Sequence, residues 1–390
     1  MTQFPMAHGS SHSAQSAVQA LCEQFGEQVA AQRQQCLGLF YLNRAASTQS
    51  DLVLKELNDR YPGVQWSGAV ADAVIAGELE LGSEPAITAM LLPLPKHSWQ
   101  SFSGNRPIGE KIHTALVHAD PMAPDLPGLI DELAQRTETG YLFGGLTLGD
   151  PQIVGQFSDG EPIRDVLSGV GFTENIRLLS RVTQGCSPFA SEHVITSCNA
   201  NYVQTLDNEP ALDVMLRDLG VDESVRQSTD GDEILQAMSG KRLANGLLVG
   251  LNDAVQDRRL GFGDYMVRNL IGIDPQSRLI AIGAEPADGD RLVFCTRDRE
   301  AARTDLIRVC TELRDEVESE SLSIRGAHFV SCVARGESLF GAVGAETALL
   351  RHNLGDVPTI GFYANGEIAR ERVYAYTGVL TLFVEANNPA

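Results

Sequence analysis

Residues 325–367, RGAHFVSCVARGESLFGAVGAETALLRHNLGDVPTIGFYANGE, combine more unusual side chains than any other part of the chain. The run HFVSCV that begins at His328 is rich in β-branched and aromatic residues, which favours a strand. Because side chains alternate along a strand, His328 and Cys332 are expected on one face. Arg335 and Gly336 end this strand, since glycine readily adopts the positive φ of a turn. The stretch therefore predicts a strand that turns a histidine and a cysteine to the same side.

The remainder of the stretch predicts a helix and a second strand. Residues 345–353 have helical periodicity, and Gly355 is a typical helix terminator. The apolar run 359–363 follows a proline and predicts a strand. Asn365-Gly366 then predicts a turn that brings Glu367 to the strand end. Side chains that bind ligands often gather at such strand ends.

The rest of the chain alternates helix-like and strand-like patterns. Apolar residues recur every three or four positions in 13–33, which predicts an amphipathic helix, and the apolar run 36–42 predicts a buried strand. Runs at 153–157, 169–172 and 176–183 predict an antiparallel meander, because short turns separate them. We predict an α/β (α+β) fold with two intimately packed halves, each a mixed, largely antiparallel β-sheet covered by helices.

Chain length and local composition predict the domain limits. With 390 residues and 43% hydrophobic content, the chain is longer than a typical single domain. Residues 221–245 are polar and rich in aspartate, so we place the boundary there. The predicted parts are a leader with an N-terminal helix over 1–34, a first domain over 35–230 and a second over 231–386.

The charge of the chain excludes two classes of partner. It has 30 basic and 51 acidic residues and a net charge of -21, which repels nucleic acid and anionic membranes. The seven cysteines are scattered without any CxxC spacing, so neither a disulfide framework nor a zinc ribbon is indicated. There is no apolar run of membrane-spanning length and no signal-peptide pattern. We therefore expect a cytoplasmic protein.

Several motifs resemble one known family. The segments FVSCVARGESLFG, GDVPTIGFYANGEI and YTGVLTLF resemble the C-terminal half of FIST sensory domains, and QGC, GGLTLGD and LDNEPALDV resemble motifs of the same family. This resemblance spans residues 35–384. It implies that 35–230 is a FIST N-terminal domain and 231–386 a FIST C-terminal domain. It also implies an intracellular ligand-binding sensor of bacterial signal transduction, and one group of similar proteins binds haem and senses nitric oxide.

The resemblance makes haem b the expected cofactor, with a small molecule or gas as the ligand. A haem requires an apolar slot and an axial donor, most often a neutral imidazole. His328 is the first candidate for the iron ligand, and His193, which follows the QGC segment, is the second. His118 and His352 are weaker candidates.

Other side chains of the two segments are also candidates for the binding site. Cys332 and Cys186 could supply a thiolate, although thiolate ligands suit oxygen activation better than reversible sensing. Arg335, beside Gly336, could hold a ligand carboxylate, or could pair with Glu367 across the same site.

Three other functions are considered beside the haem sensor. The first is a sensor of an amino acid or another small metabolite without haem. The second is an enzyme with Cys332 as nucleophile and His328 as base, which four strand positions separate by roughly 13 Å. The third is a scaffold for protein interactions. Because the chain has no kinase, receiver or DNA-binding signature, the expected output partner is a separate protein such as a histidine kinase, and a homodimer is left open.

Overall fold

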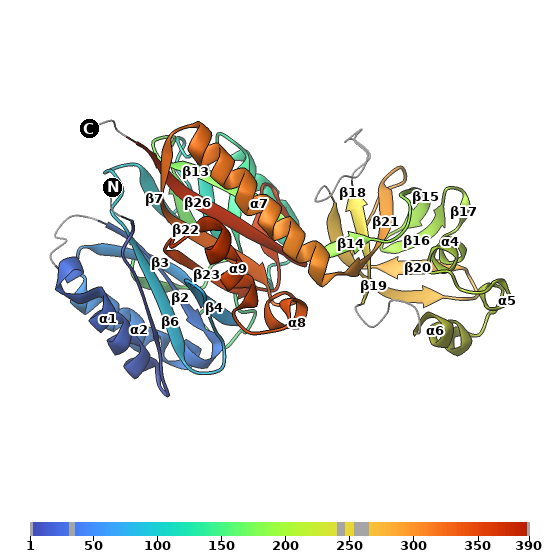
Figure 1. The fold of residues 1–390 in the computed structure, drawn as a ribbon, viewed down its shortest axis with the longest axis horizontal. Helices are drawn as coiled ribbons and strands as arrows, with labels where there is room; N and C mark the ends of the chain where they lie inside the picture. The colour runs from blue at the N-terminus through green and yellow to red at the C-terminus, as the bar shows by residue number, and fades with distance from the viewer. Residues whose placement is uncertain (1–2, 31–35, 240–245, 253–264, 388–390) are drawn as a thin grey trace. The chain divides into compact units, whose positions relative to one another are not determined.

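The computed structural model describes residues 3–30, 36–239, 246–252 and 265–387. The chain forms two compact units (Figure 1). Unit 1 comprises Met1–Thr183 and Asp305–Ala390, and unit 2 comprises Gln184–Thr304. Unit 2 is therefore inserted between two parts of unit 1 along the chain.

Unit 1 contains three six-stranded sheets. The first has the order β1 (Met6–Ser10), β6 (Ala86–Leu92), β2 (Cys36–Asn43), β3 (Val64–Ala71), β10 (Gln156–Ser158) and β11 (Glu161–Ile163). The second has the order β25 (Arg372–Tyr374), β24 (Glu367–Ala369), β9 (Tyr141–Leu146), β8 (Thr114–Ala119), β12 (Leu167–Phe172) and β7 (Trp99–Ser103). The third has the order β13 (Arg177–Gln184), β26 (Thr377–Ala386), β22 (Leu322–Cys332), β23 (Thr359–Ala364), β4 (Ala73–Ala76) and β5 (Leu79–Leu81).

Each of these sheets contains a parallel pair of strands. The pairs are β2 with β3, β8 with β9 and β22 with β23. Parallel neighbours require a crossover connection. The crossovers carry α2 (Ser50–Arg60), α3 (Leu126–Gln135), and α8 (Gly336–Phe340) with α9 (Ala345–Leu354), respectively. Unit 1 is thus built from three strand–helix–strand units, one in each sheet.

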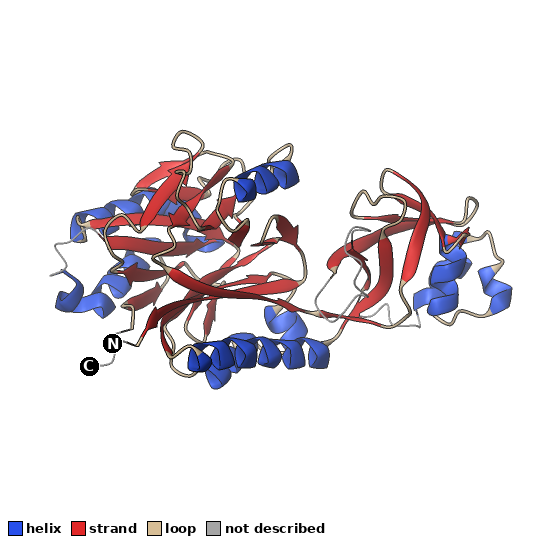
Figure 2. Cartoon of the chain, turned by 90° about the horizontal axis from the view of Figure 1, so that it is seen from above, coloured by secondary structure: helices blue, strands red, loops and turns tan. Residues whose placement is uncertain are grey.

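Helices cover the outside of the sheets in unit 1 (Figure 1, Figure 2). α1 (Ala14–Ala30) and α2 pack on the first sheet around an apolar cluster that includes Phe40 and Trp66. α3 packs on the second sheet, and α7 (Arg299–Ser319) crosses the outer face of the third. Between the sheets lies a second apolar cluster that includes Phe143, Val330 and Phe362. The sheets therefore meet around one buried, aromatic-rich core.

In its described residues, unit 2 is a sheet that closes on itself, with short helices beside it. The sheet has the order β14 (Cys186–Pro188), β21 (Arg291–Arg297), β15 (His193–Asn199), β16 (Tyr202–Leu206), β20 (Leu279–Ile282), β19 (Met266–Asp274) and β18 (Leu247–Asn252). β18 also pairs with β21, which closes the ring, and β17 (Glu209–Pro210) pairs with β16. The helices are α4 (Ala211–Asp218), α5 (Glu223–Arg226) and α6 (Gly231–Ser239). Apolar residues of α4 and α6 complete the core of this unit.

The predicted fold class is confirmed, because mixed sheets packed against helices make up the molecule. Within 325–367, the strand, the helix and the second strand all form where expected, and Gly336 and Gly355 have φ of 46° and 84°. The predicted meander is wrong. β10, β12 and β13 belong to three different sheets, since each pairs with strands distant in sequence. The limits 1–34, 35–230 and 231–386 stay a prediction, and the compact units divide the chain differently.

Candidate functional site

His328, the first candidate ligand, lies in a buried chain of three polar side chains. Tyr41 Oη is 2.7 Å from His328 Nε2 and 3.1 Å from His118 Nε2. Each residue comes from the first strand of a different strand–helix–strand unit. The three side chains therefore lie where the three sheets meet. Burial lowers the pKa of each histidine to about 3. Both imidazoles are therefore neutral, and the phenol bridges them.

The surroundings of His328 do not fit a haem. Its Nε2 is occupied by the phenol, and the rings of Tyr41, Phe143 and Phe362 lie with centroids 5.5, 5.8 and 6.1 Å from its own. The side chain is only 1% exposed. An axial ligand requires an open coordination position beside the imidazole. In this arrangement the aromatic rings fill that space.

His193, the second candidate, lies in unit 2 between two carboxylates. Its Nδ1 is 2.6 Å from Asp207 Oδ2 and its Nε2 is 2.8 Å from Asp218 Oδ2. The hydrogen bond to Asp218 raises the pKa of His193, and Asp207 adds to the effect, so its charged form is stabilised. Both ring nitrogens are occupied, and this site does not fit a haem either.

Arg335 pairs with Glu346 and not with Glu367, which corrects the expected pairing. Arg335 Nε and Nη2 lie 2.8 and 2.7 Å from Glu346 Oε1, and both side chains are fully buried. The other oxygen, Glu346 Oε2, accepts hydrogen bonds from Ser331 Oγ and from the backbone N–H of Gly336. A buried guanidinium requires a carboxylate with further donors around it. The first turn of α9 supplies that carboxylate.

Glu367 has a different environment from the expected ion pair. Its Oε2 accepts hydrogen bonds from the N–H and the hydroxyl of Thr377, at 3.1 and 2.8 Å. Complete burial raises the pKa of Glu367 to about 8, so this carboxyl is mostly protonated at neutral pH. The charge of Arg335 lowers this pKa in part, but its ion pair is with Glu346.

The cysteines of the two motifs have the character of core residues. Cys332 is 4% exposed, and burial raises its pKa to about 12. Cys186 is 1% exposed, and its backbone carbonyl accepts a hydrogen bond from Tyr265. Nucleophilic cysteines require a lowered pKa and access to solvent. The geometry therefore gives no support to Cys332 as a nucleophile with His328 as its base.

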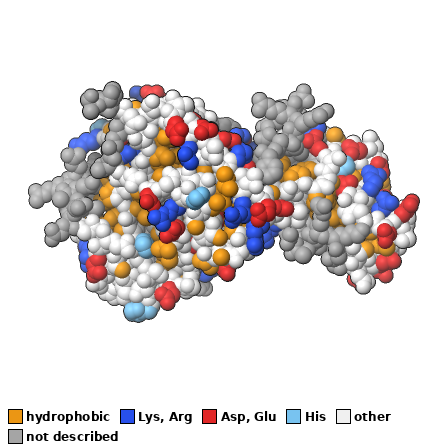
Figure 3. Space-filling model, in the orientation of Figure 1, with side chains coloured by type: hydrophobic (Ala, Val, Ile, Leu, Met, Phe, Trp, Pro, Cys, Tyr) orange, Lys and Arg blue, Asp and Glu red, His pale blue; other side chains and the backbone are white. Residues whose placement is uncertain are grey.

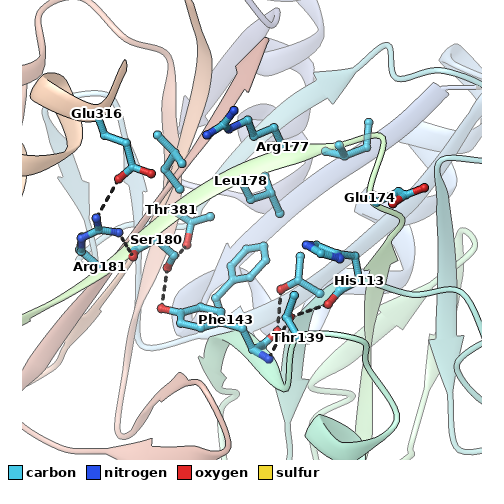
Figure 4. Close-up of a pocket in the computed structure, with 14 residues that line it drawn as sticks. His113, Thr139, Phe143, Glu174, Arg177, Leu178, Ser180, Arg181, Glu316 and Thr381 are labelled. Carbon is cyan, nitrogen blue, oxygen red and sulfur yellow. Dashed lines mark hydrogen bonds and ion pairs between the residues drawn. The ribbon is translucent and has the colours of Figure 1, made fainter. Parts of the chain in front are cut away.

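A different region of unit 1 forms an open pocket (Figure 4). Its volume is about 490 Å³, within the range of small-molecule sites. β8, β9, the edge strand β13, β26 and α7 contribute its walls. The lining residues are His113, Thr114, Thr139, Tyr141, Phe143, Glu174, Ile176, Arg177, Leu178, Leu179, Ser180, Arg181, Glu316 and Thr381.

Three hydroxyl groups form a connected chain in this pocket. Tyr141 Oη donates to Ser180 Oγ at 3.0 Å, and the hydroxyls of Ser180 and Thr381 share a hydrogen bond at 2.8 Å. Phe143 and Ile176, which are both buried, also line the pocket. The pocket thus combines an apolar surface with hydroxyl groups, as small-molecule sites commonly do.

Two of the lining residues connect the pocket to the buried histidine. Thr381 lies directly opposite His328 in the antiparallel pairing of β26 and β22, so both side chains belong to one face of the sheet. The ring of Phe143 is 5.8 Å from that of His328. A single side chain, that of Thr381 or of Phe143, therefore separates the pocket from the place where the three sheets meet.

Sequence reasoning missed the pocket and its histidine, His113. His113 Nδ1 is 3.3 Å from Glu138 Oε2, and its Nε2 has no hydrogen-bond partner in the described part of the chain. A histidine with one nitrogen bonded to a carboxylate and the other unoccupied is a common form of metal ligand. The order Arg177, Ser180, Arg181 in a strand-like run was a usable signal, because a solvent-facing edge strand beside a site carries such residues.

Three observations bear on the classes of site and partner. Over the described ranges, no three histidine, cysteine or acidic side chains are grouped so as to hold a metal ion. The helices described there are too short or too polar to cross a membrane. On the face shown in Figure 3, acidic and basic side chains are interspersed, without an extended basic patch among the coloured residues.

Comparisons with known proteins show the family of the chain. An uncharacterized protein of Mycobacterium tuberculosis (strain CDC 1551 / Oshkosh) is 28% identical over 341 residues, which are 82% of this chain and 83% of that protein. An uncharacterized protein of Mycobacterium bovis is 26% identical over 347 residues, 82% of each chain. The FIST N domain model matches residues 36–209, and the FIST C domain model matches residues 211–370. The chain therefore belongs to the FIST family of signal-transduction sensor domains.

Proposed function

We propose that this protein is a small-molecule sensor whose ligand binds in the pocket of Figure 4. One observation carries the proposal: the pocket is walled by both segments through which the chain passes between the units. β13 runs to Gln184, the first residue of unit 2, and α7 begins at Arg299, within unit 2. A ligand that contacts these two segments acts on both connections.

An ion pair joins the two segments at the pocket wall. Arg181 of β13 lies 2.8 Å from Glu316 of α7 through Nη2 and Oε2, and both residues line the pocket. A ligand shifts an equilibrium between two arrangements only if it contacts them unequally. A polar ligand that competes for Arg181 or Glu316 meets this condition, because it changes the ion pair between these two residues.

The first candidate for the ligand of this pocket is a small molecule other than haem. The second candidate is haem. The second candidate rests on the family resemblance and on His113, whose Nε2 would supply the axial nitrogen while Arg177 would pair with a propionate. Haem bound there would bring the capacity to bind nitric oxide. The engaged nitrogens of His328 and His193 favour His113 over both earlier candidates.

The output of the sensor is read by a separate signalling protein, such as a histidine kinase. The family resemblance supports this part of the proposal. A kinase assay with and without the sensor, and with and without its ligand, measures the effect directly. The proposal of a histidine kinase as partner is contradicted if the kinases of the same cell autophosphorylate at the same rate in all four conditions.

Filling the pocket tests the proposed site. Ser180→Leu places an isobutyl group beside Thr381 and Tyr141, and we expect it to remove binding of any small molecule found by a thermal-shift screen. Thr311→Leu, on the exposed face of α7, is the matched control. Ligands that stabilise the Ser180→Leu and wild-type proteins equally place the site elsewhere.

Absorption spectra separate haem from the other ligands. After reconstitution, we expect His113→Ala to lose or shift the Soret band if haem occupies the pocket, while His352→Ala on α9 keeps it. If the wild-type protein takes up no haem under conditions in which a control haem protein does, the ligand is a small molecule other than haem. A Soret band unchanged in His113→Ala eliminates His113 as the axial residue.

A further inference from the structure

The two arginines that line the pocket already have partners. Arg181 lies 2.8 Å from Glu316 and 3.6 Å from Glu312, and Arg177 pairs with Glu320. A ligand carboxylate would have to displace one of these glutamates and would leave it without a counter-ion. The arginines therefore give no net gain to an anionic ligand.

Glu174, the other carboxylate beside Glu316 in the pocket lining, stands in solvent. It lies in the turn before β13 and is exposed. Figure 4 shows it away from the hydroxyl chain that Tyr141, Ser180 and Thr381 form. Because water and salt screen an exposed charge, such a group adds little to binding. A cationic ligand therefore gains little from Glu174.

The hydroxyl chain has one proton more than it uses. Tyr141, Ser180 and Thr381 carry three hydroxyl protons and form two hydrogen bonds with one another, and these hydroxyls make no other hydrogen bond in the described part of the chain. Thr381 is fully buried, whereas Ser180 is part-exposed. Because a buried hydroxyl proton without an acceptor is costly, Thr381 donates to Ser180. Ser180 therefore keeps its own proton for an acceptor in the pocket.

Apolar side chains adjoin this donor along the strand. Leu178 and Ser180 are two positions apart in β13, so their side chains share one face and lie about 7 Å apart along the strand. Both line the pocket, together with Phe143 and Ile176. Leu178 and Ile176 also belong to the apolar cluster between the sheets. An acceptor bound to Ser180 therefore has room for an apolar chain beside it.

We infer that the ligand of the pocket is an uncharged molecule with a carbonyl group and an apolar chain, an inference that rests on the proposed function. The carbonyl oxygen accepts a hydrogen bond from Ser180, and the apolar chain lies along Leu178 and Ile176. A charged group at this position would lose its hydration to one neutral donor and apolar side chains. Since Arg181 follows Ser180 in β13, such a ligand binds one residue away from the ion pair with Glu316.

Titration of the full-length protein with three probes, followed by ligand-detected NMR, tests the charge of the ligand. The probes share a six-carbon chain: N,N-dimethylhexanamide is neutral and only accepts hydrogen bonds, hexanoate is an anion, and N,N-dimethylhexylammonium is a cation. We expect the amide to bind most tightly. Each charged probe should bind about tenfold more weakly or worse, because its charge loses water without gaining a counter-ion.

Two double variants test the hydroxyl donor, and each removes two of the three hydroxyl groups. Tyr141→Phe/Ser180→Ala leaves only the buried hydroxyl of Thr381, whereas Tyr141→Phe/Thr381→Val leaves the part-exposed hydroxyl of Ser180 with its proton free. The first variant should weaken binding of N,N-dimethylhexanamide by about twofold to tenfold, the range for one neutral hydrogen bond. The second variant, and Ser10→Ala at the exposed end of β1, should keep the wild-type affinity.

The outcomes separate this inference from the proposed function. A charged probe that binds as tightly as the amide, or equal affinity of the two double variants for the amide, overturns the uncharged carbonyl class. If a double variant does not fold, the three probes on the wild type still decide the class. The class is also overturned if the amide does not bind while another small molecule binds and is lost in Ser180→Leu, and in that case the pocket remains the site. If no small molecule binds in a manner sensitive to Ser180→Leu, the proposed function itself fails.

Discussion

His328 in unit 1 and His193 in unit 2 are both buried, yet their environments act on them in opposite directions. His328 is 1% exposed among aromatic rings, and burial lowers its pKa to about 3. His193 is 7% exposed between Asp207 and Asp218, and those carboxylates raise its pKa. One histidine is kept neutral and the other is favoured as a cation.

The difference shows that burial alone does not set the charge of a histidine. Desolvation disfavours the charged form, whereas a carboxylate within hydrogen-bond distance favours it. His328 has a phenol as its partner, and a phenol compensates no charge. His193 has two carboxylates, which more than offset its burial. The neutral histidine is therefore a connecting group of the core, and the histidine whose charged form is favoured is a local ion-pair centre.

Removal of the His328 side chain should have the largest effect. His328→Ala leaves a cavity between three aromatic rings and takes a hydrogen bond from Tyr41, so we expect a loss of about 3–5 kcal/mol in the free energy of unfolding. Urea unfolding at pH 7.5 measures it. His328→Phe keeps the aromatic volume and should lose less. Equal losses in the two variants would mean that the hydrogen bond, and not the volume, matters.

Acid titration should reveal the neutral histidines of unit 1. Because the folded pKa of His118 lies near 3 and the unfolded value near 6.5, its contribution is present above pH 6.5 and is lost as pH falls. Between pH 6.5 and 5 the loss in the free energy of unfolding amounts to about 2 kcal/mol for one histidine. His118→Leu removes the loss, so the wild type should destabilise more than the variant on acidification.

The pH dependence of stability must be compared between the wild type and His118→Leu, because Glu367 contributes to the free energy of unfolding with the opposite sign. Its folded pKa of about 8 lies above its unfolded value of about 4.5, so it loses stability as pH rises between these values. That contribution is common to the wild type and His118→Leu and cancels in their difference. A difference that is independent of pH from 6.5 to 5 would show that the pKa of His118 is not lowered in the folded protein.

His193→Gln should change stability less and with the opposite pH dependence. Because the folded pKa of His193 is raised, its stabilising contribution is complete below pH 6.5 and is lost as pH rises through the folded pKa. We expect the wild type to exceed the variant by about 1 kcal/mol at pH 6 and by less at pH 8.5, given the partial exposure of Asp207. Unfolding monitored in unit 2 measures it, and a gap that widens with pH would contradict the ion-pair assignment.

Local structure in 325–367 could be predicted from sequence because its signals are local. Glycine at the positive-φ positions 336 and 355 and the two-residue period of 328–332 depend only on neighbouring residues. The pairing of strands could not be predicted in the same way. β10, β12 and β13 follow one another in the chain but pair with partners from distant segments, and short turns carry no information about those partners.

The site was harder to predict than the fold for a related reason. His328 and Arg335 are unusual residues in a strand-like motif, and the structure uses both inside the core, with partners Tyr41 and Glu346 that sequence spacing does not reveal. The pocket is formed by residues from five elements and from the loops beside them, each with an ordinary local pattern. Only the tertiary fold places them around one space.

The smallest expected effect concerns the ion pair at the pocket wall. Glu316→Gln should change the free energy of unfolding by about 0.5 kcal/mol or less, because Arg181 and Glu316 are 38% and 27% exposed and Arg181 keeps Glu312 nearby. No histidine is involved, so the effect should not vary between pH 6 and 8, in contrast to both histidine variants. Hydrogen exchange should nevertheless increase in β13 and in the part of α7 around residue 316, since the pair joins these segments and local opening responds to contacts too weak to change global stability. Thr311→Leu on the same helix should leave the exchange of β13 unchanged. If Glu316→Gln and Thr311→Leu have identical exchange in β13, then Arg181 and Glu316 do not couple the two segments, and a ligand must act on them through the hydroxyl chain instead.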